Sequence, residues 1–375
     1  MWVVKTEKGK FRMCERFPMP DRTYKVFSVT MEKNNAQTRK SAAQLLAARA
    51  GRATGTEFTL ENVLAAYLRD QEKTVRPQTA KRNKTTLTRF VRFLGPRVPI
   101  ADLSAGYCRQ VLLKQNKPEG WRNEYIVRLK AMLRWAYRND YIDNTRCADK
   151  LQLFPVPVSS MEDVENKYLT SDELWAVIDA LEEQPHWQLA AEFLVLTGLR
   201  FGEFAALLPE DFSPAGIRIN KTYNETYHRT NDPKTYTSIR IVPIQEELAA
   251  VIREINLFVK KEKLKHPEIK KAPYWFPKIP NRRMKKLNNL HISIFAFDKA
   301  FKKVCEDITG KSLTAHGLRH THASLLFEQG FTYDQVGRRL GHAGNSRVTR
   351  EIYVHITEKL RQKDADAIKQ IRLLS

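Results

Sequence analysis

The sequence predicts a multidomain protein in three parts: a small β-sheet plus helix, an all-α bundle, and a mixed, mainly helical domain with a small β-sheet. Three observations support this. The chain has 375 residues, whereas a domain usually holds roughly 100–200. Its 42% hydrophobic and 28% charged residues are typical of globular chains with buried cores. Short strand-like runs near the N-terminus give way to helical spacing of apolar residues further along.

The first segment, about residues 1–54, is predicted to form three strands and one helix. The expected strands are separated by turns at Gly9 and at the Pro18–Asp21 stretch. Thr38 is expected to open a helix over Arg39–Arg49, and a linker is expected from Gly51 to Gly55. Because the segment is basic, it is either an accessory DNA-binding module or a packing extension.

The second segment, about residues 56–155, is predicted to be a helical bundle with a basic exterior. Thr59 is expected to cap its first helix, and Pro77 separates that helix from the second. A third helix is expected over 122–137, with lysines and arginines between its apolar positions. A stiff extended linker is expected at Phe154–Val158, where prolines and valines alternate.

The third segment, about residues 165–375, is longer and mixed. Ser171 is expected to begin a helix with acidic residues in its first turn, and another helix is expected over Trp187–Leu196. Strands are expected at Gly216–Ile219 and Ser238–Ile244, joined by a polar hairpin. Helices are expected to dominate from there to the end.

Net charge is the strongest global signal. Lysine and arginine total 64 against 42 acidic residues, which gives a formal charge of +22 and a pI of about 9.8. A field of this sign attracts polyanions and accelerates their encounter. A soluble basic protein and a protein on anionic membranes are the alternatives. Because basic residues are spread along the whole chain, the sequence favours a protein that wraps a nucleic acid.

The cysteines and apolar runs indicate a cytoplasmic location. No Cys-x-x-Cys pair is present, so a zinc knuckle is not expected. Apolar runs such as Leu189–Leu196 are too short to cross a bilayer, and the N-terminus lacks a signal-peptide pattern. In a reducing cytoplasm, four isolated cysteines are each expected to be small buried apolar residues: Cys14, Cys108, Cys147 and Cys305.

The first motif with chemical potential is Thr-Gly-Leu-Arg-Phe-Gly-Glu at 197–203. It places Arg200 between two apolar helices, the second of which is expected at Phe204–Leu208. A guanidinium in such a position requires a partner for its charge. That partner is either Glu203, in a buried pair, or a phosphate.

The second motif, Thr-Ala-His-Gly-Leu-Arg-His-Thr-His-Ala-Ser, occupies 314–324. His316 and Arg319 are three residues apart, so at a helix start they share one face. The three histidines of this motif could suggest a metal site. Because no acidic residue accompanies them, a metal site is the weaker interpretation.

Two shorter motifs follow. Leu-Gly-His at 340–342 contributes His342, and Glu-Ile-Tyr-Val-His at 351–355 contributes Tyr353. Each of these would be unremarkable alone, since a single tyrosine at helical spacing usually belongs to a core.

Taken together, the four motifs resemble those of the tyrosine recombinase (phage integrase) family, in order and in spacing. The interval from His342 to Tyr353 is slightly longer than in many relatives. The resemblance implies the tyrosine recombinase catalytic fold over 165–375 and a helical, SAM-like core-binding domain over 56–155. It further suggests the integrase of a mobile genetic element, with residues 1–54 as an arm-type DNA-binding domain.

The resemblance also implies roles for the motif residues. Arg200 and Arg319 would hold the scissile phosphate through paired, charge-assisted hydrogen bonds. Tyr353 would attack it and form a 3′-phosphotyrosine, which retains the energy of the broken bond, so that rejoining needs no ATP. His316 and His342 would bind the phosphate and help to move protons.

A lysine of the hairpin would protonate the leaving 5′-hydroxyl in this family. Lys234 is the best match and Lys221 is its rival. Glu203 is expected to support the Arg200 turn. No cofactor or metal is implied. Structural roles are expected for the remaining histidines of the motifs: His320, His322 and His355.

Similar proteins clamp double-stranded DNA between the core-binding and catalytic domains and act as homo-tetramers on two duplexes. The expected partners are therefore attachment-site DNA, with core and arm sites, and further copies of the chain. A directionality factor and a DNA-bending protein are additional expected partners, in a bacterial host cytoplasm. The tail Glu358–Ser375 is expected to be an amphipathic helix that docks on a neighbouring subunit.

Three other interpretations compete with an element integrase. A type IB topoisomerase shares the chemistry, but the accessory N-terminal module argues against it. A chromosome-dimer resolvase of the Xer kind would be shorter and generally lacks an arm module. A DNA-binding regulator that kept the fold would not need a nucleophile, so the complete set of catalytic residue types argues against it.

Overall fold

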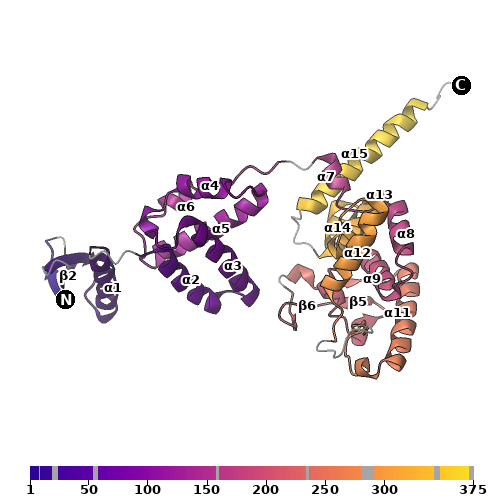
Figure 1. The fold of residues 1–375 in the computed structure, drawn as a ribbon, viewed down its shortest axis with the longest axis horizontal. Helices are drawn as coiled ribbons and strands as arrows, with labels where there is room; N and C mark the ends of the chain where they lie inside the picture. The colour runs from indigo at the N-terminus through magenta and orange to yellow at the C-terminus, as the bar shows by residue number, and fades with distance from the viewer. Residues whose placement is uncertain are drawn as a thin grey trace. The chain divides into compact units, whose positions relative to one another are not determined.

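The computed structural model describes residues 1–7, 9–18, 24–53, 58–157, 160–233, 236–280, 290–341 and 347–370. The chain divides into two compact units, 1–157 and 158–375, each of which is described by itself (Figure 1). None of the helices in the described part of the chain combines the length and the apolar character that a membrane crossing requires.

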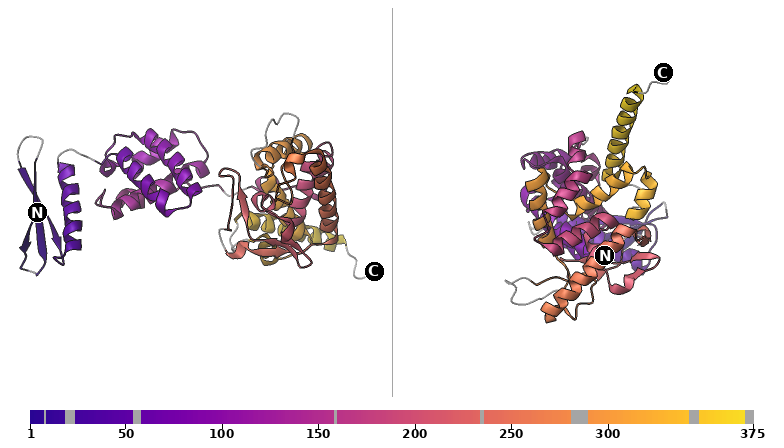
Figure 2. Two further views of the ribbon diagram at one scale, coloured as in Figure 1. Left: turned by 90° about the horizontal axis from the view of Figure 1, so that it is seen from below. Right: turned by 90° about the vertical axis from the view of Figure 1, so that its right-hand side faces the viewer.

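The first unit begins with a three-stranded antiparallel sheet and a helix packed on it (Figure 2), as predicted. The central strand pairs with both others, and Met13 on it is fully buried with Ala42 and Leu46 of the helix. The elements are β1 (Trp2–Lys5), β2 (Phe11–Pro18), β3 (Tyr24–Met31) and α1 (Ala36–Ala53).

Helix α1 begins earlier than predicted because Asn35, not Thr38, caps it. The amide of Thr38 donates to Asn35 Oδ1 at 2.9 Å, and the amide of Asn35 donates to Thr38 Oγ1 at 3.0 Å. Such a reciprocal pair satisfies two donors that a helix start leaves open. The helix continues to Ala53, so the prediction of a linker from Gly51 was wrong at that residue. Gly55 lies outside the described residues.

The helical bundle of the first unit surrounds one apolar core that includes Phe90 and Leu129. Thr59 caps the first helix as predicted, since its Oγ1 accepts from the amide of Asn62 at 3.3 Å. Pro77 is the first residue of the second helix, where its missing N–H has no cost. Helices α4 and α6 were not predicted from the sequence. The elements are α2 (Leu60–Thr74), α3 (Pro77–Leu94), the 3-10 helix η1 (Ile100–Asp102), α4 (Ala105–Leu113), α5 (Glu119–Arg138) and α6 (Arg146–Lys150).

The extended segment after α6 is anchored at its start. Phe154 is buried, and its backbone amide and carbonyl both bond to the Asn123 side chain, at 2.7 and 2.9 Å. The Arg109 guanidinium lies 4.2 Å from the centre of the Phe154 ring. Phe154 therefore belongs to the bundle and not to the stiff linker predicted from it onward.

The second unit contains a three-stranded antiparallel sheet, a separate hairpin and a set of helices. Its largest apolar core lies among α9, α11, α12 and α13 and includes Phe193, Phe204, Phe297 and Phe301. The helices are α7 (Met161–Glu165), α8 (Ser171–Asp179), α9 (Pro185–Thr197), α10 (Phe201–Phe204), α11 (Glu246–Lys265), α12 (Ile294–Thr309), α13 (Ala315–Glu328), α14 (Tyr333–Leu340), α15 (Arg347–Gln370) and the 3-10 helices η2 (Pro209–Asp211), η3 (Tyr236–Ser238) and η4 (Pro267–Ile269). The strands are β4 (Phe212–Ser213), β5 (Gly216–Ile219), β6 (Thr222–Asn224), β7 (Arg229–Asn231) and β8 (Arg240–Val242).

The predicted strands and hairpin of this unit are confirmed, with β8 shorter than expected. The helix predicted at Phe204–Leu208 was wrong: α10 ends at Phe204. Helix α7 was not predicted at all. Three of the four cysteines are buried as expected, but Cys147 is only half-buried.

Candidate active site

The turn that carries Arg200 follows a helix end that only glycine can form. Gly198 ends α9 in the left-handed region, with φ 66°. A Cβ on Gly198 would lie 2.5 Å from the His322 ring and 2.7 Å from the Leu340 side chain, so no other residue fits there. The chain then reverses into α10, which begins directly after Arg200.

Glu203 holds this turn together and lies between two arginines. Its carboxylate accepts from the Arg200 amide at 3.0 Å and from Arg200 Nη1 at 2.9 Å. Arg240 of β8 donates to the same carboxylate from Nη2 at 2.9 Å and from Nη1 at 3.3 Å. Burial opposes ionisation of Glu203, but the hydrogen bonds and charge of Arg240, with Arg200, hold its pKa below the ordinary value. The Arg200–Glu203 pair considered in the sequence analysis therefore exists, and Arg200 still keeps 40% of its side chain exposed.

Arg319 joins the same turn to the end of α14. Its Nη1 donates to the Gly198 carbonyl and its Nη2 to the Leu340 carbonyl, both at 2.6 Å. The residue is almost completely buried. Burial, and next the charge of Arg200, lower the pKa of Arg319 to about 9, which still leaves it charged at neutral pH.

His316 lies one turn before Arg319 on α13, on the same face, as the spacing predicted. Desolvation of its ring, followed by the charges of Arg319 and Arg200, lowers the pKa of His316. Its ring meets that of His320 edge to face, with centres 4.6 Å apart. The charges of Arg319 and Arg200 thus act on the His316 ring and favour its neutral form.

Arg339 and His322 form a supporting layer beneath the site. His322 is buried and its Nδ1 lies 2.6 Å from the Val195 carbonyl, while its Nε2 accepts from Arg339 Nε at 3.0 Å. These contacts require a neutral ring with the proton on Nδ1. Burial, then the Arg339 charge, lower the pKa of His322 to about 3. Arg339 also donates to the Leu196 carbonyl at 3.1 Å.

Tyr353 is on α15, whose N-terminal half packs on α13. Its ring contacts those of Phe327, at 5.1 Å between centres, and Tyr333, at 6.0 Å. Within the described residues, the contacts of the Tyr353 side chain do not include Arg200, His316 or Arg319. The predicted site residue His342 lies outside the described residues, just after Gly341, which ends α14 in the left-handed region.

Of the two lysines proposed from the sequence, the structure describes only Lys221. Lys221 Nζ is bound to Asp211, at 2.6 Å from Oδ2 and 2.7 Å from Oδ1, and Asp211 is fully buried. Lys234 lies outside the described residues. Among the side chains that the structure describes, no group of three or more His, Cys, Asp or Glu is arranged to hold a metal ion.

Two arginines of the site, Arg240 and Arg339, were missed by sequence reasoning. Arg240 lies in a predicted strand and Arg339 in a helix, where arginines are ordinarily exposed. No sequence signal marked Arg240, because alternation in a strand predicts that its neighbours Ile239 and Ile241 face the core and that Arg240 faces solvent. The structure has the reverse arrangement, with both isoleucines exposed and the Arg240 side chain only 7% exposed.

Comparisons with known proteins identify the family of the chain. The sequence model of the Phage integrase family matches residues 167–359. The chain is 23% identical to the prophage ps2 probable integrase of Lactococcus lactis over 99% of this chain and 100% of that protein.

Two solved structures have the same fold. A Tn1549 transposon integrase in complex with transposon right end DNA has a TM-score of 0.60 at 19% identity, covering 83% of this chain and 99% of that one. A lambda integrase tetramer bound to a Holliday junction has a TM-score of 0.56 at 15% identity, covering 93% of each chain. The family match contains Arg200, Arg319 and Tyr353, and the chain belongs to the phage integrase family, the tyrosine recombinases.

Proposed function

We propose that the chain is a site-specific recombinase that cuts and rejoins DNA through a 3′-phosphotyrosine intermediate and thereby integrates and excises a mobile element. The observation that carries the proposal is that Arg319 donates a hydrogen bond to Gly198, two residues before Arg200, while His316 lies one turn before Arg319 on α13. Attack on a phosphodiester builds negative charge on the non-bridging oxygens. Two guanidinium groups and a neutral imidazole offer donors to that charge, and one such donor is commonly worth roughly 3–4 kcal/mol.

The proposed reaction uses the remaining motif residues. The Tyr353 hydroxyl oxygen attacks the phosphorus, the bond from phosphorus to the 5′ oxygen breaks, and the tyrosine becomes esterified to the 3′ phosphate. The departing 5′ oxygen takes a proton from Lys234. His316 and His342 bind the phosphate and relay protons. A 5′-hydroxyl of a second strand reverses these steps and completes the exchange.

The choice of Lys234 as the proton donor is supported by the contacts of the alternative, Lys221. The ammonium of Lys221 is held by Asp211, a fully buried carboxylate, and also donates to Asn220 Oδ1 at 3.2 Å. Movement of Lys221 to a phosphate would leave Asp211 charged and buried without its closest partner.

The proposed partner is double-stranded DNA at the attachment sites. In this proposal the bundle, 56–155, contacts the core site, and the 1–54 module contacts arm sites. Helix α3 presents a row of exposed basic side chains that suits a phosphate backbone: Lys81, Lys84, Arg89 and Arg92. The Tn1549 and lambda integrases were solved on DNA, and the lambda protein as a tetramer. By analogy we infer a homo-tetramer in a bacterial cytoplasm, with a directionality factor and a bending protein as further partners.

The test is a trapping assay without metal. The protein is mixed with a duplex that spans the end of its element and is nicked near the expected cleavage point. The expected result is an SDS-resistant protein–DNA adduct with the wild type, insensitive to EDTA, and none with Tyr353→Phe. Binding to the duplex should be equal in the two proteins.

Two outcomes would favour other functions. If the duplex is bound but neither protein forms an adduct, a DNA-binding regulator with the recombinase fold becomes the better interpretation. If adducts form and supercoils are relaxed but two sites are never joined, the chain acts as a topoisomerase.

A further inference from the structure

Helix α7 lies directly against the helix that carries Tyr353. Val164 and Tyr168 are buried in one apolar cluster with Ile352 and Ile356 of α15. All four side chains are at most 5% exposed. Helix α7 and the residues after it therefore pack against one side of α15.

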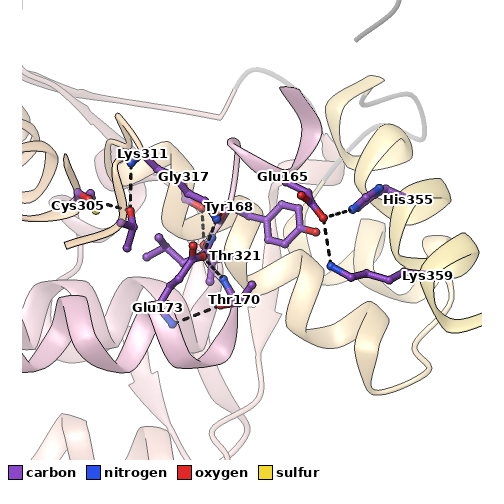
Figure 3. A network of polar contacts seen from close by, with 12 residues as sticks. Glu165, Tyr168, Thr170, Glu173, Cys305, Lys311, Gly317, Thr321, His355 and Lys359 are labelled. Atoms are coloured by element: carbon purple, nitrogen blue, oxygen red, sulfur yellow. Dashed lines mark hydrogen bonds and ion pairs between the residues drawn. The ribbon is translucent and has the colours of Figure 1, made fainter. Parts of the chain in front are cut away.

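Ion pairs at the edge of this cluster join the same two segments. Lys167 Nζ lies 2.9 Å from Glu351 Oε2, and both side chains are largely buried. On the other side, Glu165 Oε1 lies 3.2 Å from His355 Nε2 and 3.1 Å from Lys359 Nζ (Figure 3). The His355 side chain is 5% exposed, with its Nδ1 3.3 Å from the sulfur of Met161.

The two α15 residues in these pairs, Glu351 and His355, lie on the side of the helix opposite Tyr353, one before it in the chain and one after it. Glu351 and His355 are four residues apart and share a face, which is turned toward α7. Tyr353, two residues from each, is about 200° away around the axis. It contacts Phe327 and Tyr333 of α13 and α14 instead. Helix α15 thus packs against α13 and α14 on the side of Tyr353, and against α7 and the residues that follow it on the other side.

We propose that Glu165 and Lys167 are positioning residues for the nucleophile: they form a clasp that sets the rotation of α15 and so the place of the Tyr353 hydroxyl. The proposal rests on the proposed function. A tyrosine hydroxyl lies roughly 8 Å from its helix axis, so a rotation of about 20° moves it by about 3 Å. Attack requires reacting atoms about 3–3.5 Å apart, and a displacement of about 1 Å can cost about 100-fold in rate.

His355 also takes part in these contacts. A structural role was expected for it from the sequence, and in the structure it is buried between Met161 and Glu165. His355 lies two residues after Tyr353, so its side chain is on nearly the opposite side of α15 and reaches Glu165 of α7.

A charge-swap cycle tests the proposal. The variants are Lys167→Glu, Glu351→Lys and the double variant, which restores an ion pair with reversed sign. Lys302→Glu is the matched control: it makes the same change in net charge on α12, where Lys302 pairs with Glu306 and not with α15. Adduct formation is followed on the nicked duplex at saturating protein, with DNA affinity and melting temperature measured separately.

We expect adduct formation to slow about 10- to 100-fold in each single variant and to recover at least tenfold in the double variant. DNA affinity should match that of Lys302→Glu throughout. The proposal is overturned if the single variants cleave at the wild-type rate or faster, or if the double variant is as slow as the singles.

A second readout does not depend on enzymatic activity. Hydrogen–deuterium exchange in the free protein should show faster exchange of the 349–358 amides in each single variant, and wild-type exchange in the double variant. If the wild type forms no adduct at all, the proposed function fails, while this exchange result still decides whether the clasp holds α15. Unchanged exchange in the single variants would overturn the clasp.

Discussion

The Arg319 guanidinium lies 2.6 Å from the carbonyl oxygen of Gly198, the residue whose left-handed conformation begins the Arg200 turn. A second nitrogen of the same group is bonded to the Leu340 carbonyl at the end of α14. Arg319 therefore links, through two hydrogen bonds, the segment that leads to Arg200 and the segment that leads toward His342. If Arg319 binds a phosphate, it must use the guanidinium N–H groups that do not donate to the Gly198 and Leu340 carbonyls.

Arg319→Lys should damage both stability and activity. Lysine has a single nitrogen and cannot bridge two carbonyls as the planar guanidinium does. Loss of one buried partner typically costs about 1–3 kcal/mol in the free energy of unfolding. We expect that loss in urea unfolding, together with at least about 100-fold slower adduct formation. Wild-type stability in this variant would show that the two carbonyl contacts contribute nothing.

Arg240→Gln should be among the more destabilising substitutions in the second unit. The change leaves the buried Glu203 carboxylate without its bidentate partner, which typically costs about 3–5 kcal/mol. Arg218→Gln is the control, because the Arg218 side chain is 53% exposed and its pair with Asp211 is 3.6 Å long. Urea unfolding should separate the two variants clearly. Equal unfolding midpoints would contradict the central position given to Arg240.

The sequence predicted the elements whose signals are local. The three strands near the N-terminus, the Thr59 cap and the β5 strand all follow from spacing and turn chemistry. The motifs predicted a site, and the structure joins two of their segments across more than a hundred positions in the chain, since Arg319 donates to the carbonyl of Gly198, two residues before Arg200.

What the sequence did not predict depends on contacts between distant segments. Helix α7 has only one turn, and although Ser160 and Asp163 form a capping box at its start, a helix this short also depends on packing, here the burial of Val164 against α15. Arg240 and Arg339 are anchored by Glu203 and by His322, and no periodic pattern marks such partners. The start of the linker was misplaced at Phe154 because its anchor, Asn123, is on α5, about thirty residues earlier in the chain.

Lys234 and Lys221 should give opposite results when each is changed to methionine. Lys221→Met should lower stability, because it removes the closest partner of the buried Asp211 carboxylate. Lys234→Met should leave stability unchanged and slow adduct formation, because the leaving 5′ oxygen lacks its proton donor. A substrate with a sulfur at the 5′ position needs no protonation on departure, so it should restore cleavage by Lys234→Met. Restoration in Lys221→Met instead would reverse the assignment.

Removal of the tail should affect assembly and not single-site binding. Helix α15 extends to Gln370, and among its described side chains, which end at Leu360, Leu360 itself packs against the apolar cluster. A chain that ends at Arg361 therefore keeps the packing of Tyr353 described above. If the tail docks on a neighbouring subunit, this truncated chain should bind one site normally but fail to recombine two. Normal recombination would exclude the docking role.

Glu192 should make the stability of the second unit depend on pH. Burial between α9 and α11, followed by the charges of Glu254 and Glu247, raises the pKa of Glu192 to about 7. A carboxyl whose pKa is raised on folding stabilises the protein below its ordinary pKa, near 4.5, and that contribution is lost as pH rises through about 7. Glu192→Gln should therefore increase stability at pH 8 by roughly 1 kcal/mol after allowance for solvent screening, and have much less effect at pH 5. The measurement is urea unfolding at both pH values, with the exposed Glu183→Gln as control. An equal effect of Glu192→Gln at pH 5 and pH 8 would show that Glu192 titrates normally in the folded chain.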